Sequence, residues 1–248
     1  MNWSPQESAR YELELRDSRA LSYDLEYARL HGPFFPAVEM SIIRRGLDLT
    51  RQDVLLDLGC GTGRLTEQLA PLTEHVIAVD RSGRSLDVLR DRLAQRSLAN
   101  VTIVQADVAR DLPIDQRVSK VLGVQLLQHL PTSHDRLSVL RSAAELLERG
   151  GRCLVIDEVF NLVRRVRGKA RELARPDSLF FHTFTPREMR DTVNKAGLRP
   201  IQYMGCGIFY WTGYRLAPEI LTRLDQWGSP LPGAWLISKF GATVAVKD

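Results

Sequence analysis

The stretch VLLDLGCGTGRL, residues 54–65, places three glycines within five positions, directly after an apolar run that ends in an acid. The apolar run predicts a buried strand, and the glycines predict a tight turn into a helix at about residues 64–70. Such a turn exposes backbone N–H groups beside the positive end of a helix, where ligand atoms approach the main chain closely. We therefore expect Gly59, Gly61 and Gly63 to border a ligand, with Asp57 in front of them.

The glycine spacing weakens a nicotinamide-binding interpretation. It reads GxGxG, and position 64 is Arg where a GxGxxG pyrophosphate loop has its last glycine. Seventeen residues after Gly63, Asp80 ends the next predicted strand, and a carboxylate there can accept both hydroxyls of an unphosphorylated ribose. Asp107 follows the third predicted strand. Because the carboxyl ends of parallel strands share one sheet edge, these acids and Asp57 are expected to line one crevice.

Strand and helix patterns alternate along the chain, which is typical of βαβ units and a parallel sheet. Helical spacing appears at Leu86, Leu89 and Leu93, and again over 137–147 before a Gly-Gly pair at 150–151 that is expected to end the helix. Thr185, Pro186 and Glu188 form the pattern of a capping box. The predicted strands span 54–58, 75–79, 101–104, 120–124, 152–156, 201–204 and 243–246.

Composition sets limits on the class of protein. The chain has 248 residues, 44% of them hydrophobic, which is enough for one α/β domain with a full core. Its net charge of +4 is poor evidence for a nucleic-acid partner. Cys60, Cys153 and Cys206 are scattered, and no long apolar run or leader is visible. We expect a cytoplasmic protein with a helical extension over 1–50 and a core over 51–248, in which 159–184 and 205–240 approach an acceptor.

Several motifs, in order, resemble the class I S-adenosylmethionine-dependent methyltransferases over roughly residues 40–248. They are VLLDLGCGTGRL, VIAVDRS, IVQADV, VLGVQLLQHLP, LLERGGRCLVID and FTPREMRDTVNKAGL. The resemblance implies a doubly wound, Rossmann-like α/β fold whose seven-stranded sheet has an antiparallel last strand, which GATVAVKD fits. Ser119 replaces an acid that the family often has at the start of the fourth strand, and we expect a structural consequence at most.

The resemblance also implies S-adenosylmethionine as the cofactor and nine residues that bind it. They are Asp57, Gly59, Gly61, Gly63 and Gln125 for the methionine part, Asp80 for the ribose, and Arg81, Asp107 and Val108 for the adenine. In the N-terminal stretch SYDLEYARLHGPFFP, residues 22–36, Tyr23, Tyr27 and Arg29 either reach the cofactor or pack against the core.

Methyl transfer from a sulfonium is an in-line displacement in which alignment supplies much of the rate. An acceptor that is protonated at neutral pH also needs a base, and three residues are candidates. His129 follows the fourth strand, and its ordinary pKa of about 6.5 suits this role, although a turn-capping role is the alternative. Glu158, after Asp157, is either a base or an acid in the first turn of the following helix. For His182 a functional role and a packing role are equally favoured. No metal is expected, because His129 and His134 lack further matched ligands and the fourth strand ends in Gln125.

Two further segments have alternative interpretations. The arginine-rich run RRVRGKARELAR, residues 164–175, is either a basic lid for an acidic acceptor or a solvated helix face. The aromatic cluster GIFYWTGY, residues 207–214, either walls a flat acceptor or belongs to the core.

Three functions remain open on the sequence. The first is a methyltransferase that modifies oxygen or nitrogen of a small organic acceptor. The second is an RNA methyltransferase, against which the fourth motif lacks both the Asp/Asn-Pro-Pro-aromatic set and the Pro-Cys pair, and no RNA-binding module is visible. The third is a cofactor-binding partner subunit without catalytic activity. The first is the best supported, whereas the acceptor and the oligomeric state are not fixed.

Overall fold

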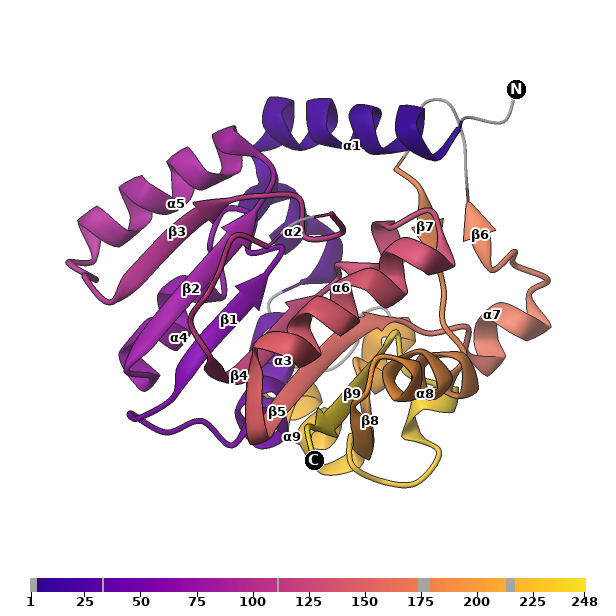
Figure 1. Ribbon diagram of the computed structural model, residues 1–248. Coiled ribbons are helices and arrows are strands. Elements are labelled where there is room, and N and C mark those ends of the chain that lie inside the picture. Colours follow the sequence, from indigo (N-terminus) through magenta and orange to yellow (C-terminus); the bar gives the residue numbers. More distant parts are fainter. Residues whose placement is uncertain (1–3, 33, 111, 174–178, 213–216) are drawn as a thin grey trace.

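The computed structural model describes residues 4–32, 34–110, 112–173, 179–212 and 217–248, and its centre is a seven-stranded sheet (Figure 1). The sheet order is β3-β2-β1-β4-β5-β9-β8, in which β1 to β5 run parallel and β9 is antiparallel to both its neighbours. The strands are β1 (Val54–Leu58), β2 (His75–Asp80), β3 (Val101–Gln105), β4 (Val118–Val124), β5 (Leu147–Glu158), β8 (Arg199–Cys206) and β9 (Phe240–Val246). The predicted fold class and its antiparallel last strand are confirmed.

Helices cover both faces of the sheet because successive strand residues point to opposite sides. Leu55 packs into a core shared with α3 (Phe34–Leu47), α5 (Gly83–Gln95) and α9 (Pro218–Gly228). Leu56 and Leu58 pack into a second core shared with α6 (Ser133–Leu146) and α8 (Pro186–Lys195). The register sets Leu58 of β1 opposite Val79 and Gly123, so the carboxyl ends of β1, β2 and β4 lie at one level.

Two N-terminal helices lie beyond this edge of the sheet. Figure 1 shows α1 (Pro5–Arg19) crossing the molecule near α5, and α2 (Tyr23–His31) leads from it toward α3. Glu12 of α1 pairs with Arg81 at 2.7 Å, and the hydroxyl of Ser82 donates to Asp17 Oδ1 at 2.6 Å. These contacts hold α1 over the ends of β2 and α5.

Some predicted boundaries were wrong. The helix after the glycines is only α4 (Thr66–Leu69), followed by a 3-10 turn η1 (Ala70–Leu72). The Gly-Gly pair at 150–151 lies within β5, because α6 already ends at Leu146 and β5 begins at Leu147. The Thr185 side chain caps α8 through the Glu188 N–H, but the Glu188 carboxylate turns to His182 and Arg171, so only half of the capping box forms.

Several smaller elements lie outside the seven-stranded sheet. A short helix α7 (Leu162–Val166) leads to a ribbon of β6 (Glu172–Leu173) and β7 (Phe181–His182), neither of which was predicted. The 3-10 turns are η2 (Leu127–His129), η3 (Ile208–Thr212) and η4 (Ala234–Leu236). Across the described ranges, none of the helices has both the length and the apolar character required for a membrane span.

Ser119 lies near the start of β4, at the opposite end of the strands from these turns. Its hydroxyl donates to Asp53 Oδ1 at 2.7 Å and accepts the Val54 N–H at 3.1 Å. An acid is therefore present at this end after all, contributed by the residue before β1, and Ser119 links it to the strand.

Candidate functional site

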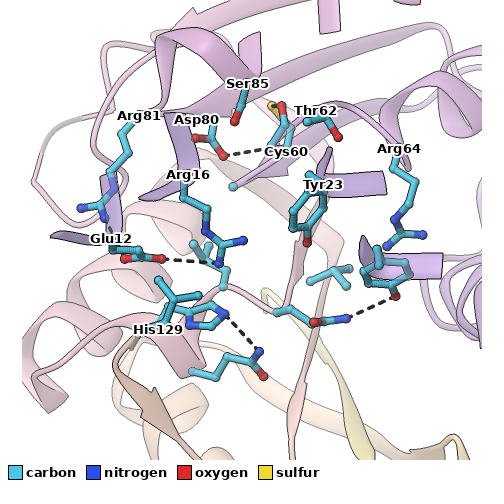
Figure 2. A pocket seen from close by; sticks show the side chains of 18 of the residues that line it. Glu12, Arg16, Tyr23, Cys60, Thr62, Arg64, Asp80, Arg81, Ser85 and His129 are labelled. Atoms are coloured by element: carbon cyan, nitrogen blue, oxygen red, sulfur yellow. Dashed lines mark hydrogen bonds and ion pairs between the residues drawn. The ribbon is translucent and has the colours of Figure 1, made fainter. Parts of the chain in front are cut away.

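A cavity of about 360 Å³ opens at the carboxyl ends of β1, β2, β4 and β5 and is walled by α1 and α2 (Figure 2). We name three parts of its lining. The glycine-loop end consists of Asp57, Gly59, Gly61, Asp80 and Asp107; the histidine end consists of Gln128, His129, Glu158, Phe181 and Lys239; the helical wall consists of Arg16, Tyr23 and Tyr27. Arg81, Val108 and Gln125 also line the cavity, so it gathers ten of the twelve residues predicted for the site.

The glycine loop is tied to the end of β2 by its backbone. Gly61 donates its N–H to Asp80 Oδ2 at 2.9 Å, and Ser82 donates its N–H to Asp80 Oδ1 at 2.9 Å. Each carboxylate oxygen can accept a further hydrogen bond. Asp80 is therefore oriented by two backbone donors and can still accept two hydroxyl groups.

The three glycines have different surroundings. All have positive φ, 70° at Gly59, 55° at Gly61 and 78° at Gly63, a conformation that favours glycine. A Cβ at Gly61 would meet no atom within 4 Å, whereas one at Gly63 would lie 2.1 Å from Leu89 Cδ1 and one at Gly59 would lie 2.9 Å from Leu126 Cδ1. Gly61 thus leaves space open to a ligand, whereas Gly63 allows α5 to pack closely and does not line the cavity.

Acids on neighbouring strands differ in their environment. Asp57 is buried, accepts the Thr66 hydroxyl at 2.7 Å, and burial raises its pKa to about 6. Asp107 follows β3 and accepts the Ala109 N–H at 3.1 Å. Val108 beside it is buried and packs into the core below the cavity. The predicted edge of acids is therefore present, with Asp57 the most desolvated of them.

Gln125 has strained backbone at the end of β4. Its φ is 52°, in the left-handed region that a residue with a side chain rarely adopts and that is often found at functional sites. Its N–H donates to the Ile156 carbonyl at 2.7 Å, and its Nε2 donates to the Tyr27 hydroxyl at 3.3 Å. This backbone turns the amide side chain toward the helical wall.

His129 is buried at the histidine end, and its ring is held at both nitrogens. Nδ1 lies 3.0 Å from the Phe180 carbonyl, so Nδ1 carries the proton and donates it there. Nε2 lies 3.3 Å from Gln128 Nε2, a long contact with an amide donor. Burial, with the charges of Arg16 and Arg81, lowers the pKa of His129 to about 3. The expected pKa near 6.5 was therefore wrong, and the imidazole stays neutral at physiological pH.

Glu158 lines the cavity between two cations. It pairs with Lys239 and with Arg164 of α7, and its N–H donates to Gln128 Oε1 at 2.9 Å. The neighbouring Asp157 accepts the Gln128 N–H at 3.0 Å, and burial raises the Asp157 pKa to about 8. The end of β5 therefore clamps η2, rather than capping the following helix, whose cap is Asn161.

His182 lies outside the cavity lining. Its Nδ1 is 2.8 Å from Glu172 Oε1 and its Nε2 is 2.8 Å from Glu188 Oε1, and the ring is buried. Both nitrogens are thus engaged by carboxylates between β6 and α8. The structure places His182 as a link between these two elements.

The remaining sequence candidates are only partly at the cavity. Tyr23 and Tyr27 line it, but Arg29 does not, and Arg164 turns inward to Glu158 instead of facing solvent. Tyr210, in the aromatic cluster, packs on the core ring of Phe35 and donates to the Leu30 carbonyl at 3.1 Å. Residues 213–214 of that cluster and 174–175 of the arginine-rich run lie outside the described residues.

Sequence reasoning missed several polar residues of the lining, among them Glu12, Arg16, Gln128 and Lys239. Figure 2 shows Arg16 reaching from α1 between Asp80 and His129, and it approaches Glu12 Oε1 at 3.6 Å. No motif surrounds Arg16 or Lys239, although the four-residue spacing of Glu12 and Arg16 shows that they share a helix face. Over the described part of the chain, no three His, Cys, Asp or Glu side chains come together as a metal site.

Comparisons with known proteins agree with this geometry. Residues 55–151 match the family model described as a methyltransferase domain. The chain is 29% identical over 209 residues to a ubiquinone biosynthesis O-methyltransferase of Cereibacter sphaeroides, covering 73% of this chain and 80% of that protein. It is 39% identical over 83 residues to the ribosomal RNA small subunit methyltransferase A of Shouchella clausii, covering 32% of this chain and 27% of that protein.

The fold also matches solved structures. An S-adenosylmethionine-dependent methyltransferase from Clostridium acetobutylicum superposes with a TM-score of 0.68 at 14% identity, covering 91% of this chain and 98% of that one. The fold, the methyltransferase-domain match and the methyltransferase relatives agree on one enzyme class and one cofactor, S-adenosylmethionine. The protein is therefore an S-adenosylmethionine-dependent methyltransferase, with a methyltransferase domain over residues 55–151 and the seven-stranded fold of such enzymes.

Proposed function

We propose that this enzyme methylates an oxygen or a nitrogen of a small organic acceptor. The observation that carries the proposal is that one cavity of about 360 Å³ contains both the glycine-loop end and the histidine end, walled by α1 and α2. Two reactants in such a space are held in contact and away from water, which suits an in-line displacement. The name of the Cereibacter relative favours oxygen as the methylated atom.

The residues at the glycine-loop end fit the cofactor. Gly61 offers a bare backbone whose missing Cβ leaves open space, and Asp80 offers two oriented oxygens for the ribose hydroxyls. Arg81, Asp107 and Val108 hold the adenine, while Asp57, Gly59 and Gln125 surround the methionine part. Gly63 contributes to this site through packing. When bound, S-adenosylmethionine supplies an electrophilic methyl group.

His129 receives the acceptor's proton in this proposal. Its Nδ1–H is fixed on the Phe180 carbonyl, which leaves the lone pair on Nε2. The long contact from Gln128 is easily exchanged for an acceptor hydroxyl or amine. Because the His129 pKa is about 3, the imidazole orients the acceptor through a hydrogen bond and takes the proton only as the acceptor atom becomes positive. Glu158, between its two cations, is the second candidate for this role.

The proposal also includes the role of the N-terminal helices, the absence of a metal requirement and the cellular location. Residues 1–50 act as a cap on the core of residues 51–248, supported by the contacts of α1 with α5 and of Glu12 with Arg81. The proposed transfer uses no metal, because the sulfonium of the cofactor is itself the electrophile and alignment supplies much of the rate. The enzyme works in the cytoplasm, which is consistent with its free Cys60, Cys153 and Cys206.

RNA is not the proposed acceptor. The ribosomal RNA methyltransferase of Shouchella clausii is matched over only 27% of its length, which does not extend to a whole RNA-binding enzyme. The net charge of +4 is too small to indicate a phosphate-binding surface.

A transfer assay tests the proposal. The protein is incubated with methyl-labelled S-adenosylmethionine and panels of phenols, carboxylic acids and amines, and in parallel with total bacterial RNA, each with and without EDTA. We expect label in at least one small-molecule panel, unaffected by EDTA, and none with Gly61→Val. Label confined to RNA, or transfer that EDTA abolishes, contradicts the proposal.

A further inference from the structure

One corner of the cavity holds a buried cation with unused hydrogen-bonding capacity. Arg64 follows the glycine loop directly and lines the cavity, with its side chain 17% exposed. Its Nη2 pairs with Glu39 Oε2 at 2.7 Å. Its Nη1 is buried and, among the residues that the structure describes, has no hydrogen-bond partner. Leaving a charged donor buried and unpaired is costly, so a ligand acceptor is expected there.

The N-terminal helices fix the orientation of this guanidinium. Glu39 of α3 is fully buried, and Tyr27 of α2 donates its hydroxyl to Glu39 Oε1 at 3.2 Å. The carbon at the centre of the Arg64 guanidinium lies 4.1 Å from the centre of the Tyr27 ring, a cation–π contact. Gln125 Nε2 donates to the same Tyr27 hydroxyl at 3.3 Å. Arg64 is therefore held by Glu39 and by the Tyr27 ring, and both contacts keep its guanidinium at the cavity.

The charge next to Arg64 suggests what the ligand carries. Asp57 also lines the cavity, and the positive charge of Arg64 acts to lower its pKa. Asp57 forms no ion pair with any described residue. A cation with a free donor beside an unpaired acid matches a zwitterionic α-amino acid group, whose carboxylate meets the guanidinium and whose ammonium meets the acid. The cofactor carries such a group at its methionine end.

We propose that Arg64 is the receptor for the α-carboxylate of S-adenosylmethionine, binding it through Nη1. This inference rests on the proposed cofactor assignment and adds to it a residue that discriminates the amino acid part from the nucleoside part. It makes α2 and α3, through Tyr27 and Glu39, positioning elements of the cofactor site.

Calorimetry with two ligands tests it. S-Adenosylhomocysteine carries the amino acid group, and 5′-methylthioadenosine has the same nucleoside and thioether sulfur without it. For Arg64→Gln we expect the dissociation constant of S-adenosylhomocysteine to rise about 10–100-fold, as for loss of a charged hydrogen bond, with that of methylthioadenosine changed less than about 2-fold. Arg64→Lys should recover part of the loss. Arg199→Gln, which removes an arginine paired with Asp248 away from the cavity, should bind both ligands normally.

A second variant guards against misfolding. Arg64→Gln leaves Glu39 buried without its partner, so the double variant Arg64→Gln/Glu39→Gln removes both charges and should show the same ligand-selective loss. Equal loss of both ligands in the double variant overturns the inference, because Arg64 then only shapes the cavity. Unchanged S-adenosylhomocysteine affinity with a raised acceptor KM also overturns it. If the wild type binds neither ligand, the proposed cofactor site itself fails, and the inference fails with it.

Discussion

The two ends of the cavity are built in different ways. The glycine-loop end uses backbone: Gly61 donates its N–H to Asp80 at 2.9 Å, and the participating residues lie within three successive strand–turn units. The histidine end uses side chains from η2, β5, β7 and the segment before β9, so that Gln128 and Lys239 both contact Glu158 from distant parts of the chain. A ligand common to the family can be bound by backbone, whereas a variable acceptor is met by side chains that change without altering the fold.

The largest effect is expected from a substitution at Gly61, and it distinguishes the role of this glycine from that of Gly63. Gly61→Val places a side chain into open space beside Asp80, where the cofactor is proposed to lie. We expect S-adenosylhomocysteine affinity to fall at least ~1,000-fold by calorimetry, since steric exclusion removes the contacts of the whole amino acid part. Circular dichroism should show a folded protein.

Matched glycine variants provide the control. Gly168→Val introduces the same strain, at φ 61° and with no atom within 4 Å, but away from the cavity, and should bind normally. Gly63→Ala should instead lower the free energy of unfolding by about 1–3 kcal/mol, because its Cβ overlaps Leu89. If Gly63→Ala abolished binding with unchanged stability, the distinction between the two glycines would be wrong.

Asp80→Ala tests the next contact of the same end. The variant loses a carboxylate oriented by two N–H groups, and we expect both S-adenosylhomocysteine and methylthioadenosine to weaken by about 1–3 kcal/mol, since both carry the ribose. Wild-type protein should bind neither NAD nor NADP in the same titration. Loss confined to S-adenosylhomocysteine would place the ribose elsewhere.

His129→Gln tests the second end. We expect kcat to fall about 10–100-fold, at or below the lower limit for a general base, because the neutral imidazole is a weak base. S-Adenosylhomocysteine affinity should not change. The wild-type pH–rate profile should lack an acidic limb near pH 6.5, and a limb there that disappears in the variant would show that His129 titrates near neutrality.

The same residue gives the stability a pH dependence. His129 has a pKa of about 3 in the folded protein and about 6.5 when unfolded, so the unfolded chain binds a proton first as pH falls. Its contribution is complete above pH 6.5 and is lost as pH falls from 6.5 toward 3. Urea unfolding between pH 7.5 and 4.5 should show a steeper loss for wild type than for His129→Gln, and equal slopes would contradict the burial argument.

The smallest effects are expected in the arginine-rich run. Arg165 and Arg167 are exposed, so replacing both with Gln should change the acceptor KM less than about 2-fold. Arg164→Gln should raise it more, because Glu158 then loses one of its two cations at the cavity. A large effect of the exposed pair, increasing at low salt, would restore the basic-lid interpretation.

Much of the fold was predictable from the spacing of apolar residues and from the residues that separate one element from the next. Seven apolar runs separated by helical patterns located every strand of the sheet, and GATVAVKD matched the antiparallel β9. The ribbon of β6 and β7 was missed because two-residue strands carry no pattern. The length of α4 was overestimated, since Leu69 and Ala70 suit a helix but Pro71 continues the chain into a 3-10 turn.

The site was predictable only where its residues directly follow predicted strands. Asp57, Gly59, Gly61 and Asp80 follow strand ends, so sheet topology alone brings them together. The alternatives at His129 and His182 were separated only by their surroundings, one ring bordering the cavity and the other lying between two glutamates. The pKa of His129 depends on burial and on the charge of Arg16 from α1, an electrostatic interaction between residues 113 positions apart that no local pattern encodes.

A crystal structure of the complex with S-adenosylhomocysteine tests the central claim most directly, that one cavity aligns the cofactor between its two ends. We predict the ribose hydroxyls on the Asp80 carboxylate, the adenine beside Asp107 and Val108, and the sulfur beyond Gly61 on the side that faces the histidine end. Ligand density outside this cavity, or inside it with the adenine beside His129 and the sulfur beside Asp107, would contradict the account.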